Sequence, residues 1–480
     1  MARTRTATAA LAHHPWLAPA HRRPLALVRR ASSRTRTAPT DLRWPGWVPT
    51  IGLELHVQLK GNPKLFSPEH ALYDDTPNTR VAPFDAALPG TLPVLQPQAV
   101  RLALLACLAF DANINPRSTF DRKHYFYPDL TTGWQVTQRY DPLAKDGLVR
   151  VPRPPVKGAN PKRSKAARDD DDEEYFAVRL EQIQLEQDTA KSFHDPSLPP
   201  SGGTLVDLNR AGAALVEIVT RPDMHSPEEA AAFVKTLQAV LRHIGASGAN
   251  MDKGELRCDV NVSVARASPD GEEPQEQGTR CEVKNLNGVR FIASAIESEI
   301  TRQIALLSAS EPVAQSTRGF DALTGSTFHL RSKESSPDYR YVPDPELGAL
   351  VVAPHALAAL RAAMPELPGA ARARLRAQYG LGTREASVLV ALGEGGGAGD
   401  DGAPRAAEPG IGVRWFEALA AGREPKTAAN WLIHTYLGLL ARASRPLARS
   451  PLAPDELGAL IDAVADRRIT ATEAKSLLGA

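Results

Sequence analysis

The fold of this chain follows from the stretch Ile51-Gly52-Leu53-Glu54-Leu55-His56-Val57-Gln58-Leu59. Apolar and polar residues alternate along it, and a β-strand turns successive side chains to opposite faces of its sheet. The leucines and Val57 therefore share one face, while Glu54, His56 and Gln58 share the other. We predict a strand that buries one face and presents carboxylate, imidazole and amide groups on the other.

The same period of two recurs in three later segments, which are Gln184-Leu185-Glu186-Gln187-Asp188, Arg257-Cys258-Asp259-Val260-Asn261-Val262-Ser263 and Arg280-Cys281-Glu282-Val283-Lys284. Four such strands predict a sheet with a concave, polar, ion-binding face. The alternative is a solvated outer face, which is the common fate of alternating polar residues in antiparallel strands. The convergence of carboxylates with one imidazole favours ion binding, because such groups hold hard cations. Magnesium prefers oxygen ligands at about 2.1 Å and leaves positions for phosphate oxygens, although spacing alone does not exclude zinc.

A second motif, at residues 120–129, combines Arg122, Lys123 and His124 with several aromatic residues. Cations attract phosphates and aromatic rings stack on bases, so contact with ATP or with the end of a tRNA is one interpretation. Core packing of the aromatic residues is the other. The sequence contains neither of the common glycine-rich phosphate-binding loops. It also lacks a serine-based amidase signature, so we do not expect the chain to hydrolyse glutamine.

The composition is that of a globular protein of two or three domains, with 480 residues, 42% hydrophobic content and a net charge of +2. The three cysteines, Cys107, Cys258 and Cys281, form no C-x-x-C pair, which argues against a disulfide framework. The most apolar run, residues 102–110, is far shorter than the roughly 18 to 20 residues of a membrane span. We therefore expect no membrane insertion.

Two segments differ chemically from the rest of the chain. Residues 1–44 are rich in arginine and contain no acidic residue before Asp41, which predicts a transit peptide, with a disordered basic arm as the alternative. Mitochondrial import is favoured over plastid import because arginine outnumbers serine. Residues 152–175 separate a basic run from an acidic run and predict a disordered insert without a catalytic role.

The remaining pattern predicts an α+β protein. We expect strands and turns over residues 47–95, helices over 98–111, 226–244 and 288–307, and further strands within 176–290. After residue 355, alanine, leucine and arginine recur at helical spacing, interrupted by the glycine-rich stretch 393–402. This change predicts a separate helical C-terminal domain.

Several motifs together resemble the B subunit of the tRNA-dependent amidotransferases. The resemblance runs in order from about residue 47 to the C-terminus. The matching stretches are 51–59, 89–95, 121–129, 185–191, 207–212, 254–264, 278–287, 338–341 and 426–431.

The resemblance implies an antiparallel catalytic cradle of the glutamine synthetase and guanido kinase type over residues 45–350. A helical tRNA-binding domain over 351–480 would follow it. The implied ligase reaction uses ATP and Mg²⁺ to phosphorylate the glutamate side chain on tRNA(Gln), and ammonia then displaces the phosphate. An amidase A subunit would supply the ammonia, a small third subunit would complete the complex, and the mitochondrial matrix would be the location.

For this chemistry we predict metal ligands at Glu54, His56 and Glu186, direct or through water, with Asp259 and Glu282 as further candidates for the same ions. Phosphoryl transfer requires charge neutralisation and alignment, so Lys123 and Lys284 would stabilise phosphate charge. Arg210 or Asn285 would position substrate, and Lys123 with Tyr125 would contact ATP. An internal salt bridge is the alternative role for each charged residue.

Three departures from the family pattern carry expectations of their own. Bacterial members often have a zinc knuckle, but residues 66–69 and 82–85 contain no cysteine, so we predict no structural zinc. Residues 131–134 replace the usual proline-containing turn, which is expected to alter one loop without affecting the chemistry. The chain ends at Ala480, where family members continue into a tail module, so the tail is expected to be shortened.

Two other functions remain open at the level of sequence. The chain could be a tRNA-binding scaffold whose cradle has lost catalysis, although the presence of Glu54, His56 and Glu186 argues against this. It could also be a tRNA-independent amide ligase of the glutamine synthetase type, in which a helical C-terminal domain would have no purpose. Use of Asp-tRNA(Asn) as a second substrate is not decided by the sequence.

Overall fold

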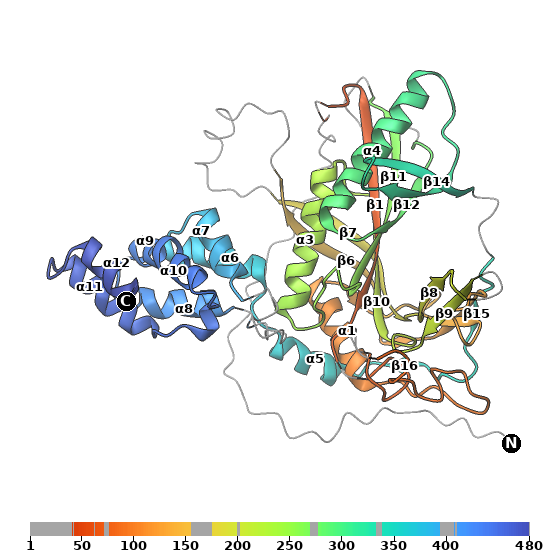
Figure 1. Ribbon diagram of the computed structural model, residues 1–480, viewed down its shortest axis with the longest axis horizontal. Helices are drawn as coiled ribbons and strands as arrows, with labels where there is room; N and C mark the ends of the chain where they lie inside the picture. Colours follow the sequence, from red (N-terminus) through yellow and green to blue (C-terminus); the bar gives the residue numbers. More distant parts are fainter. Residues whose placement is uncertain are drawn as a thin grey trace.

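The computed structural model describes residues 41, 43–61, 63–71, 76–154, 175–198, 202–268, 277–332, 338–393, 408 and 410–479. The predicted transit peptide and insert therefore lie almost entirely outside the described residues, as does most of the glycine-rich stretch 393–402. A body built on a large sheet lies beside a smaller helical body formed by the C-terminal part of the chain (Figure 1).

A nine-stranded sheet organises the larger body. Neighbouring strands pair antiparallel, except that β12 and β13 are parallel. In spatial order the strands are β14 (Ser326–Ser332), β13 (Ser316–Asp321), β12 (Cys281–Leu286), β11 (Leu256–Arg266), β1 (Trp47–Gln58), β10 (Ala214–Thr220), β7 (Tyr175–Gln187), β6 (Ala144–Pro152) and β2 (Asn113–Ile114).

Strand β1 lies in the middle of this sheet and follows the predicted alternation. Leu53, Leu55 and Val57 are at most 1% exposed and belong to the main hydrophobic core. The register places Glu54 opposite Asp259 of β11, and His56 opposite Glu217 of β10. The polar face of β1 is therefore flanked on both sides by acidic residues.

Three helices bury the apolar face of the sheet: α1 (Pro97–Ala109), α3 (Pro227–His243) and α4 (Val289–Ser308) (Figure 1). All three were predicted, with ends that differ by one or two residues. Helix α3 begins where expected because the Ser226 hydroxyl caps it, accepting a hydrogen bond of 3.1 Å from the Glu229 backbone N–H. Pro227 occupies the first turn, where its missing N–H costs nothing.

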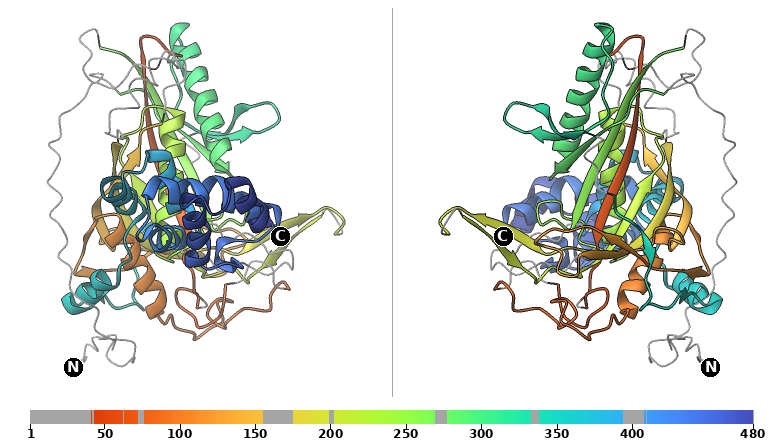
Figure 2. Two further views of the ribbon diagram at one scale, coloured as in Figure 1. Left: turned by 90° about the vertical axis from the view of Figure 1, so that its left-hand side faces the viewer. Right: turned by 90° about the vertical axis from the view of Figure 1, so that its right-hand side faces the viewer.

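Smaller sheets complete the body. One contains β15 (Val342–Pro343), β4 (Asp121–His124) and β5 (Trp134–Thr137), and another pairs β16 (Leu350–Val351) with β3 (Arg117–Ser118). The hairpin of β8 (Lys191–Asp195) and β9 (Gly203–Asp207) projects away from the body (Figure 2).

The expectation of several strands within residues 47–95 is wrong. Only β1 forms in this range, and the described residues after it follow turns and loops, because closely spaced prolines remove the backbone donors that a ladder needs. A fully buried ion pair fastens this loop, with Lys64 Nζ 2.9 Å from Asp85 Oδ2. Asp85 also accepts hydrogen bonds from the Ser67 hydroxyl and the Ala82 N–H. These contacts lie in the two segments where relatives with a zinc knuckle are expected to carry cysteines.

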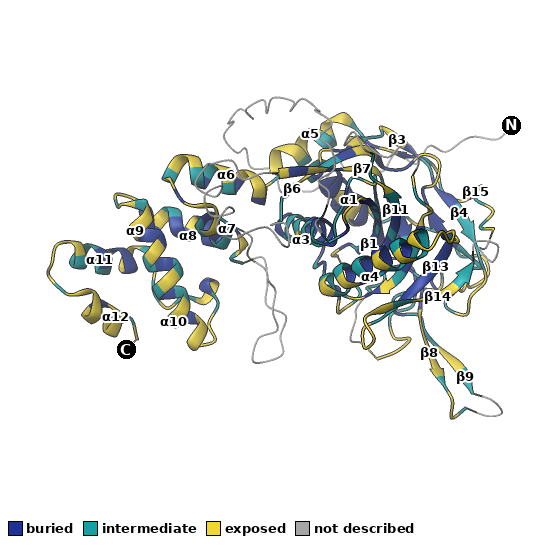
Figure 3. Ribbon diagram, turned by 90° about the horizontal axis from the view of Figure 1, so that it is seen from above, coloured by how far each residue is buried: buried dark blue, intermediate teal, exposed yellow. Residues whose placement is uncertain are grey.

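The helical body has its own hydrophobic core, which begins at Ala371. Helix α5 packs instead against the main core through Leu357 and Leu360. Seen from above, the helices after α5 carry exposed residues on their outer surfaces (Figure 3). No helix among the described residues is long and apolar enough to cross a membrane. In order, these elements are α5 (Pro354–Ala363), α6 (Pro368–Tyr379), α7 (Thr383–Ala391), α8 (Ile411–Ala420), α9 (Pro425–Asn430), a π-helix (Trp431–Tyr436), α10 (Leu437–Arg442), a 3-10 turn (Leu447–Arg449), α11 (Pro454–Ala465) and α12 (Ala471–Gly479).

The predicted class is thus confirmed at the level of a mixed α and β protein. It has a large, mainly antiparallel sheet followed by a helical C-terminal region.

Candidate active site

The four strands predicted to share a polar face lie together in the large sheet. Strands β12, β11 and β1 are consecutive, and β10 lies between β1 and β7. The alternative of a solvated outer face is wrong for the centre of this surface, because Glu186 and Glu217 are only 1% and 7% exposed. Carboxylates are rarely buried so deeply unless charged or hydrogen-bonding groups compensate for the lost water.

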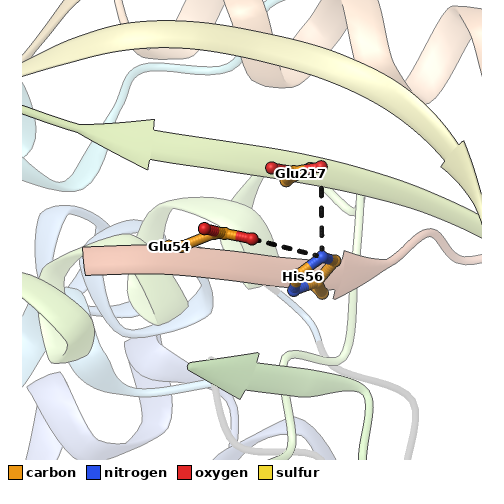
Figure 4. A group of neighbouring side chains, drawn as sticks. All are labelled: Glu54, His56 and Glu217. Atoms are coloured by element: carbon orange, nitrogen blue, oxygen red, sulfur yellow. Dashed lines mark ion pairs between the residues drawn. The ribbon is translucent and has the colours of Figure 1, made fainter. Parts of the chain in front are cut away.

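Three carboxylates gather around the imidazole of His56. Its Nε2 lies 3.4 Å from Glu186 Oε1 and 4.0 Å from both Glu54 Oε1 and Glu217 Oε2. One ligand atom from each of Glu54, His56 and Glu217 lies within 4.8 Å of the others, as a metal site requires, and Figure 4 shows these three side chains converging from β1 and β10. We call Glu54, His56, Glu186 and Glu217 the acidic cluster.

Glu217 is the member of the acidic cluster that the sequence analysis missed. It lies in Ala-Leu-Val-Glu-Ile-Val-Thr, a strand of otherwise apolar residues ending in threonine, where no alternation marks a polar face. A single glutamate inside an apolar strand was the available signal, because burial of such a residue demands a compensating partner. The pairing of β10 between β1 and β7 supplies that partner in His56.

Glutamine side chains hold the cluster in place. Gln184 Nε2 donates to Glu217 Oε2 at 2.7 Å, and Gln135 Nε2 donates to Glu186 Oε1 at 2.9 Å. Gln135 lies on β5, and a further hydrogen bond from the Val136 N–H to the Gln187 side chain at 3.1 Å fastens β5 to β7. The small sheet of β15, β4 and β5 is thereby fixed to the polar face and brings Lys123 of β4 to it.

The side chains of the acidic cluster shift one another's pKa values. Burial is the largest effect on His56 and lowers its pKa, but the hydrogen bond with Glu186 and the charges of Glu217, Glu186 and Glu54 together raise the pKa to about 9. Burial and the neighbouring Glu186 charge raise the pKa of Glu217. Burial opposes ionisation of Glu186 too, but Lys123 and His56 hold its pKa below the ordinary value. His56 is therefore an imidazolium at neutral pH.

Lys123 is the second cation of this surface. Burial lowers its pKa, but the charges of Glu186 and Glu217 outweigh burial and raise the pKa above its ordinary value. The ammonium group thus stays charged beside the cluster.

The acidic cluster has the donor set for a divalent cation. Glu186 Oε2 is buried and has no hydrogen-bond partner among the described residues, so one carboxylate oxygen is available for a ligand. Three carboxylates provide the oxygen donors that Mg²⁺ prefers, and the imidazole can bind a metal once its proton is lost.

Asp259 and Glu282 lie on the same face but form a separate group. Lys284 Nζ lies 2.5 Å from Asp259 and 2.9 Å from Glu282, so these three predicted residues pair with one another and not with His56. A cavity of about 190 Å³ borders both groups, because Glu54 of the acidic cluster and Glu282 both line it. It is lined by Glu54, Asn261, Arg280, Glu282, Gln315, Ser316 and Thr317.

The remaining predicted residues lie at the margins. Arg210 braces the chain after β7, donating to the carbonyls of Thr189 and Ala190, and its Nε lies 3.6 Å from Asp188. Asn285 is exposed with a φ of 65°, and no hydrogen bond or ion pair of the described residues joins it to the acidic cluster. The Tyr125 hydroxyl donates to Gln135 Oε1 at 3.3 Å and is thus one residue removed from Glu186.

Comparison with known proteins gives consistent matches over most of the chain. The family model described as "GatB/GatE catalytic domain" matches residues 33–358, and the one described as "GatB domain" matches residues 414–480. The B subunit of the mitochondrial glutamyl-tRNA(Gln) amidotransferase of Laccaria bicolor is 46% identical over 445 residues, covering 91% of this chain and 75% of the relative. The mitochondrial protein of the same name from Mycosarcoma maydis is 42% identical over 474 residues, covering 90% and 70%. The B subunit of the aspartyl/glutamyl-tRNA(Asn/Gln) amidotransferase of Mesorhizobium japonicum is 42% identical over 447 residues, covering 92% and 82%.

Proposed function

The chain belongs to the GatB family, and from this membership we propose that it is the subunit of a glutamyl-tRNA(Gln) amidotransferase that activates and amidates the tRNA-borne glutamate. The observation that carries the proposal is the acidic cluster beside Lys123, whose residues all lie within the region that the catalytic-domain model matches. The proposed fold is the cradle of the glutamine synthetase and guanido kinase type over residues 45–350, and residues 351–480 would bind tRNA.

The reaction has two steps. The glutamate side-chain carboxylate attacks the terminal phosphorus of ATP, which forms an acyl phosphate and releases ADP. Ammonia then attacks the acyl carbon, the bond from carbon to the phosphate oxygen breaks, and the amide forms with loss of phosphate and a proton. Activation is needed because a free carboxylate would have to expel oxide.

The chain's own residues provide charge and alignment. Lys123 holds its proton because Glu186 and Glu217 face it, so a fixed positive charge lies where phosphate oxygens would approach. Gln135 and Gln184 fix the orientation of the two buried carboxylates by hydrogen bonds. Lys284 is already neutralised by Asp259 and Glu282, so its proposed contact with phosphate requires that one of these pairs opens.

We propose Mg²⁺ as the ion of the acidic cluster, held by Glu54, His56, Glu186 and Glu217. When bound, it would neutralise charge on the phosphate oxygens of ATP. Asp259 and Glu282 are proposed for a second position of the same ion set, and Tyr125 with Lys123 for contact with ATP. Arg210 and Asn285 are retained as candidates for positioning substrate. No structural zinc is proposed.

The cell context is part of the proposal. The relatives from Laccaria bicolor and Mycosarcoma maydis are named as mitochondrial proteins, which supports an organellar location. We propose import directed by residues 1–44, with the matrix preferred over a plastid. The partners would be an amidase A subunit that supplies ammonia, a small third subunit and glutamyl-tRNA(Gln). A catalytically inactive scaffold of the same complex is the second candidate.

The test is amidation by the reconstituted complex. The chain is co-expressed with its amidase partner and given glutamyl-tRNA(Gln), ATP, glutamine and Mg²⁺, and Gln-tRNA is measured. We expect product to disappear without Mg²⁺ and to fall at least about a hundredfold in Glu186→Gln, since Glu186 contacts the proposed ion. Glu181→Gln is the matched control, because Glu181 is exposed on the same strand. Unchanged amidation by Glu186→Gln would favour the scaffold.

A further inference from the structure

Four tyrosine rings form a continuous chain beside the acidic cluster. The Tyr125 ring lies 5.8 Å from that of Tyr127 and 5.9 Å from that of Tyr339, and Tyr339 lies 6.2 Å from Tyr341, all edge to face. We call these four side chains the tyrosine row. Its two halves are separated by more than two hundred residues of sequence, so its assembly is a property of the fold.

Backbone contacts hold the two halves together. Strand β15 pairs with β4, and the His124 N–H donates to the Tyr339 carbonyl at 2.7 Å. The His124 ring nitrogen Nδ1 lies 2.9 Å from the Arg340 carbonyl. Arg340 adopts a left-handed φ of 41°, which is costly for a side chain with a Cβ and is retained because its neighbours fix it.

The row is not ordinary core packing. Tyr127 is 59% exposed and the adjacent Phe126 is 87% exposed, so aromatic surface at this end faces solvent. Two cations lie over its rings: Lys123 Nζ is 5.1 Å from the centre of Tyr339, and the Arg139 guanidinium is 5.5 Å from the centre of Tyr341. Exposed aromatic faces interleaved with cations are the surface that binds single-stranded nucleic acid.

A short hydrogen-bond path joins the row to the cluster. The Tyr125 hydroxyl donates to Gln135, Gln135 donates to Glu186, and Glu186 contacts His56. The interior of the row, at Tyr125, therefore lies next to the proposed reaction centre. Tyr127 at one end of the row is exposed, and so is Arg139, which lies over Tyr341 at the other end.

We infer that the tyrosine row is a stacking platform for the unpaired 3′ end of the acceptor strand. Tyr339 and Tyr341 position the terminal base, while Tyr125, inside the row, keeps its proposed contact with ATP. The inference rests on the proposed function. A glutamate esterified to the terminal nucleotide can reach the acidic cluster only if that nucleotide is held close by, and the row runs from the cluster to the surface. The open surface favours a strand entering from solvent over the adenine of ATP, which would be expected in a closed pocket.

The test compares binding of two deacylated tRNAs to the reconstituted complex, one intact tRNA(Gln) and one lacking its terminal adenosine. In Tyr339→Leu/Tyr341→Leu we expect the Kd of intact tRNA to rise about tenfold or more, which is the scale of a lost base–aromatic stack. The Kd of the shortened tRNA and the KM for ATP should not change. Tyr339→Phe/Tyr341→Phe keeps both rings and should bind as the unaltered complex does.

Three outcomes would overturn the inference. In the first, the leucine variant binds both tRNAs more weakly by the same factor. In the second, its Kd for intact tRNA does not change. In the third, its KM for ATP rises while tRNA binding is unaltered, which would assign the row to ATP. If the leucine variant fails to fold, tRNA ending in 2-aminopurine is bound to the unaltered complex, where stacking must quench its fluorescence. The measurements of tRNA binding and of 2-aminopurine fluorescence use no catalysis, so a complex that stacks the base but forms no Gln-tRNA would refute the proposed function alone.

Discussion

Glu217→Gln tests the electrostatics of the acidic cluster through His56. The Glu217 carboxylate lies 4.0 Å from His56 Nε2, and two unit charges at that distance attract by about 4 kcal/mol at an effective dielectric constant of about 20 and by about 1 kcal/mol in bulk water. The true loss lies between these values, because Glu217 is buried but its own pKa is raised and its charge is therefore incomplete. Removing this attraction should lower the pKa of His56 from about 9 toward 6.5.

The assay is a pH titration of the histidine Cε1 signal by NMR in ¹³C-labelled protein, with His56→Asn identifying the resonance. Glu217→Gln is isosteric and retains an oxygen to accept from Gln184, so the fold should persist. Glu181→Gln provides the control for a distant exposed charge. If His56 titrates at the same pH in Glu217→Gln as in the unaltered chain, the two side chains do not interact, which would refute the 4.0 Å approach of Glu217 to His56.

Three further results are expected. Lys64→Met leaves the buried Asp85 without its cation and should reduce the free energy of unfolding by about 3 to 5 kcal/mol, as measured by urea denaturation. A loss below about 1 kcal/mol would contradict this. Ser226→Ala removes the cap of α3 and should cost about 1 kcal/mol in the same assay, with exposed Ser310→Ala as a control near zero. Because a protonated His56 cannot bind metal, Mn²⁺ affinity measured by electron paramagnetic resonance should rise by at least about tenfold per pH unit from 7 to 9 and then level off. The rise should be steeper below pH 8, where Glu217 also loses a proton, and a flat profile would exclude His56 as a ligand.

The sequence predicted the polar face well because alternation is a local property. A period of two assigns Glu54 and His56 to one side of β1 whatever the rest of the chain does. The same reasoning identified Glu186 in β7. The order of strands is not local, and the insertion of β10 between β1 and β7 had to come from the structure. Glu217 was missed for that reason.

In residues 59–95 the sequence analysis predicted strands that do not form. Short apolar runs separated by turn residues suggested strands, but a strand also needs backbone donors and a neighbour to receive them. Prolines remove the donors, and the loop is instead held by Lys64, whose ammonium group donates to Asp85 and to the carbonyls of Arg80 and Leu208. A lone lysine gives no sign in the sequence that it will be fully buried.

The tyrosine row shows the same limit at longer range. The sequence places Tyr125 and Tyr127 in a basic, aromatic segment, where core packing and ligand contact are both reasonable. Only the pairing of β15 with β4 brings Tyr339 and Tyr341 alongside. Exposure of Tyr127 then argues against core packing for that ring, because a ring that packs in a core cannot be 59% exposed, and ligand contact stays a prediction.

The charges of the acidic cluster explain how its carboxylates can be buried before any ion binds. Glu186 and Glu217 would be destabilising if unpaired, since a buried carboxylate needs a counter-charge. The His56 imidazolium and the Lys123 ammonium supply two positive charges. Exchange of the His56 proton for a divalent ion replaces one of these charges by two. Where Glu217 is already ionised, the site would then be more positive by one charge at the position proposed for the phosphate oxygens of ATP. The same carboxylates that are stabilised by protonated His56 would leave that loaded site better suited to an anionic substrate.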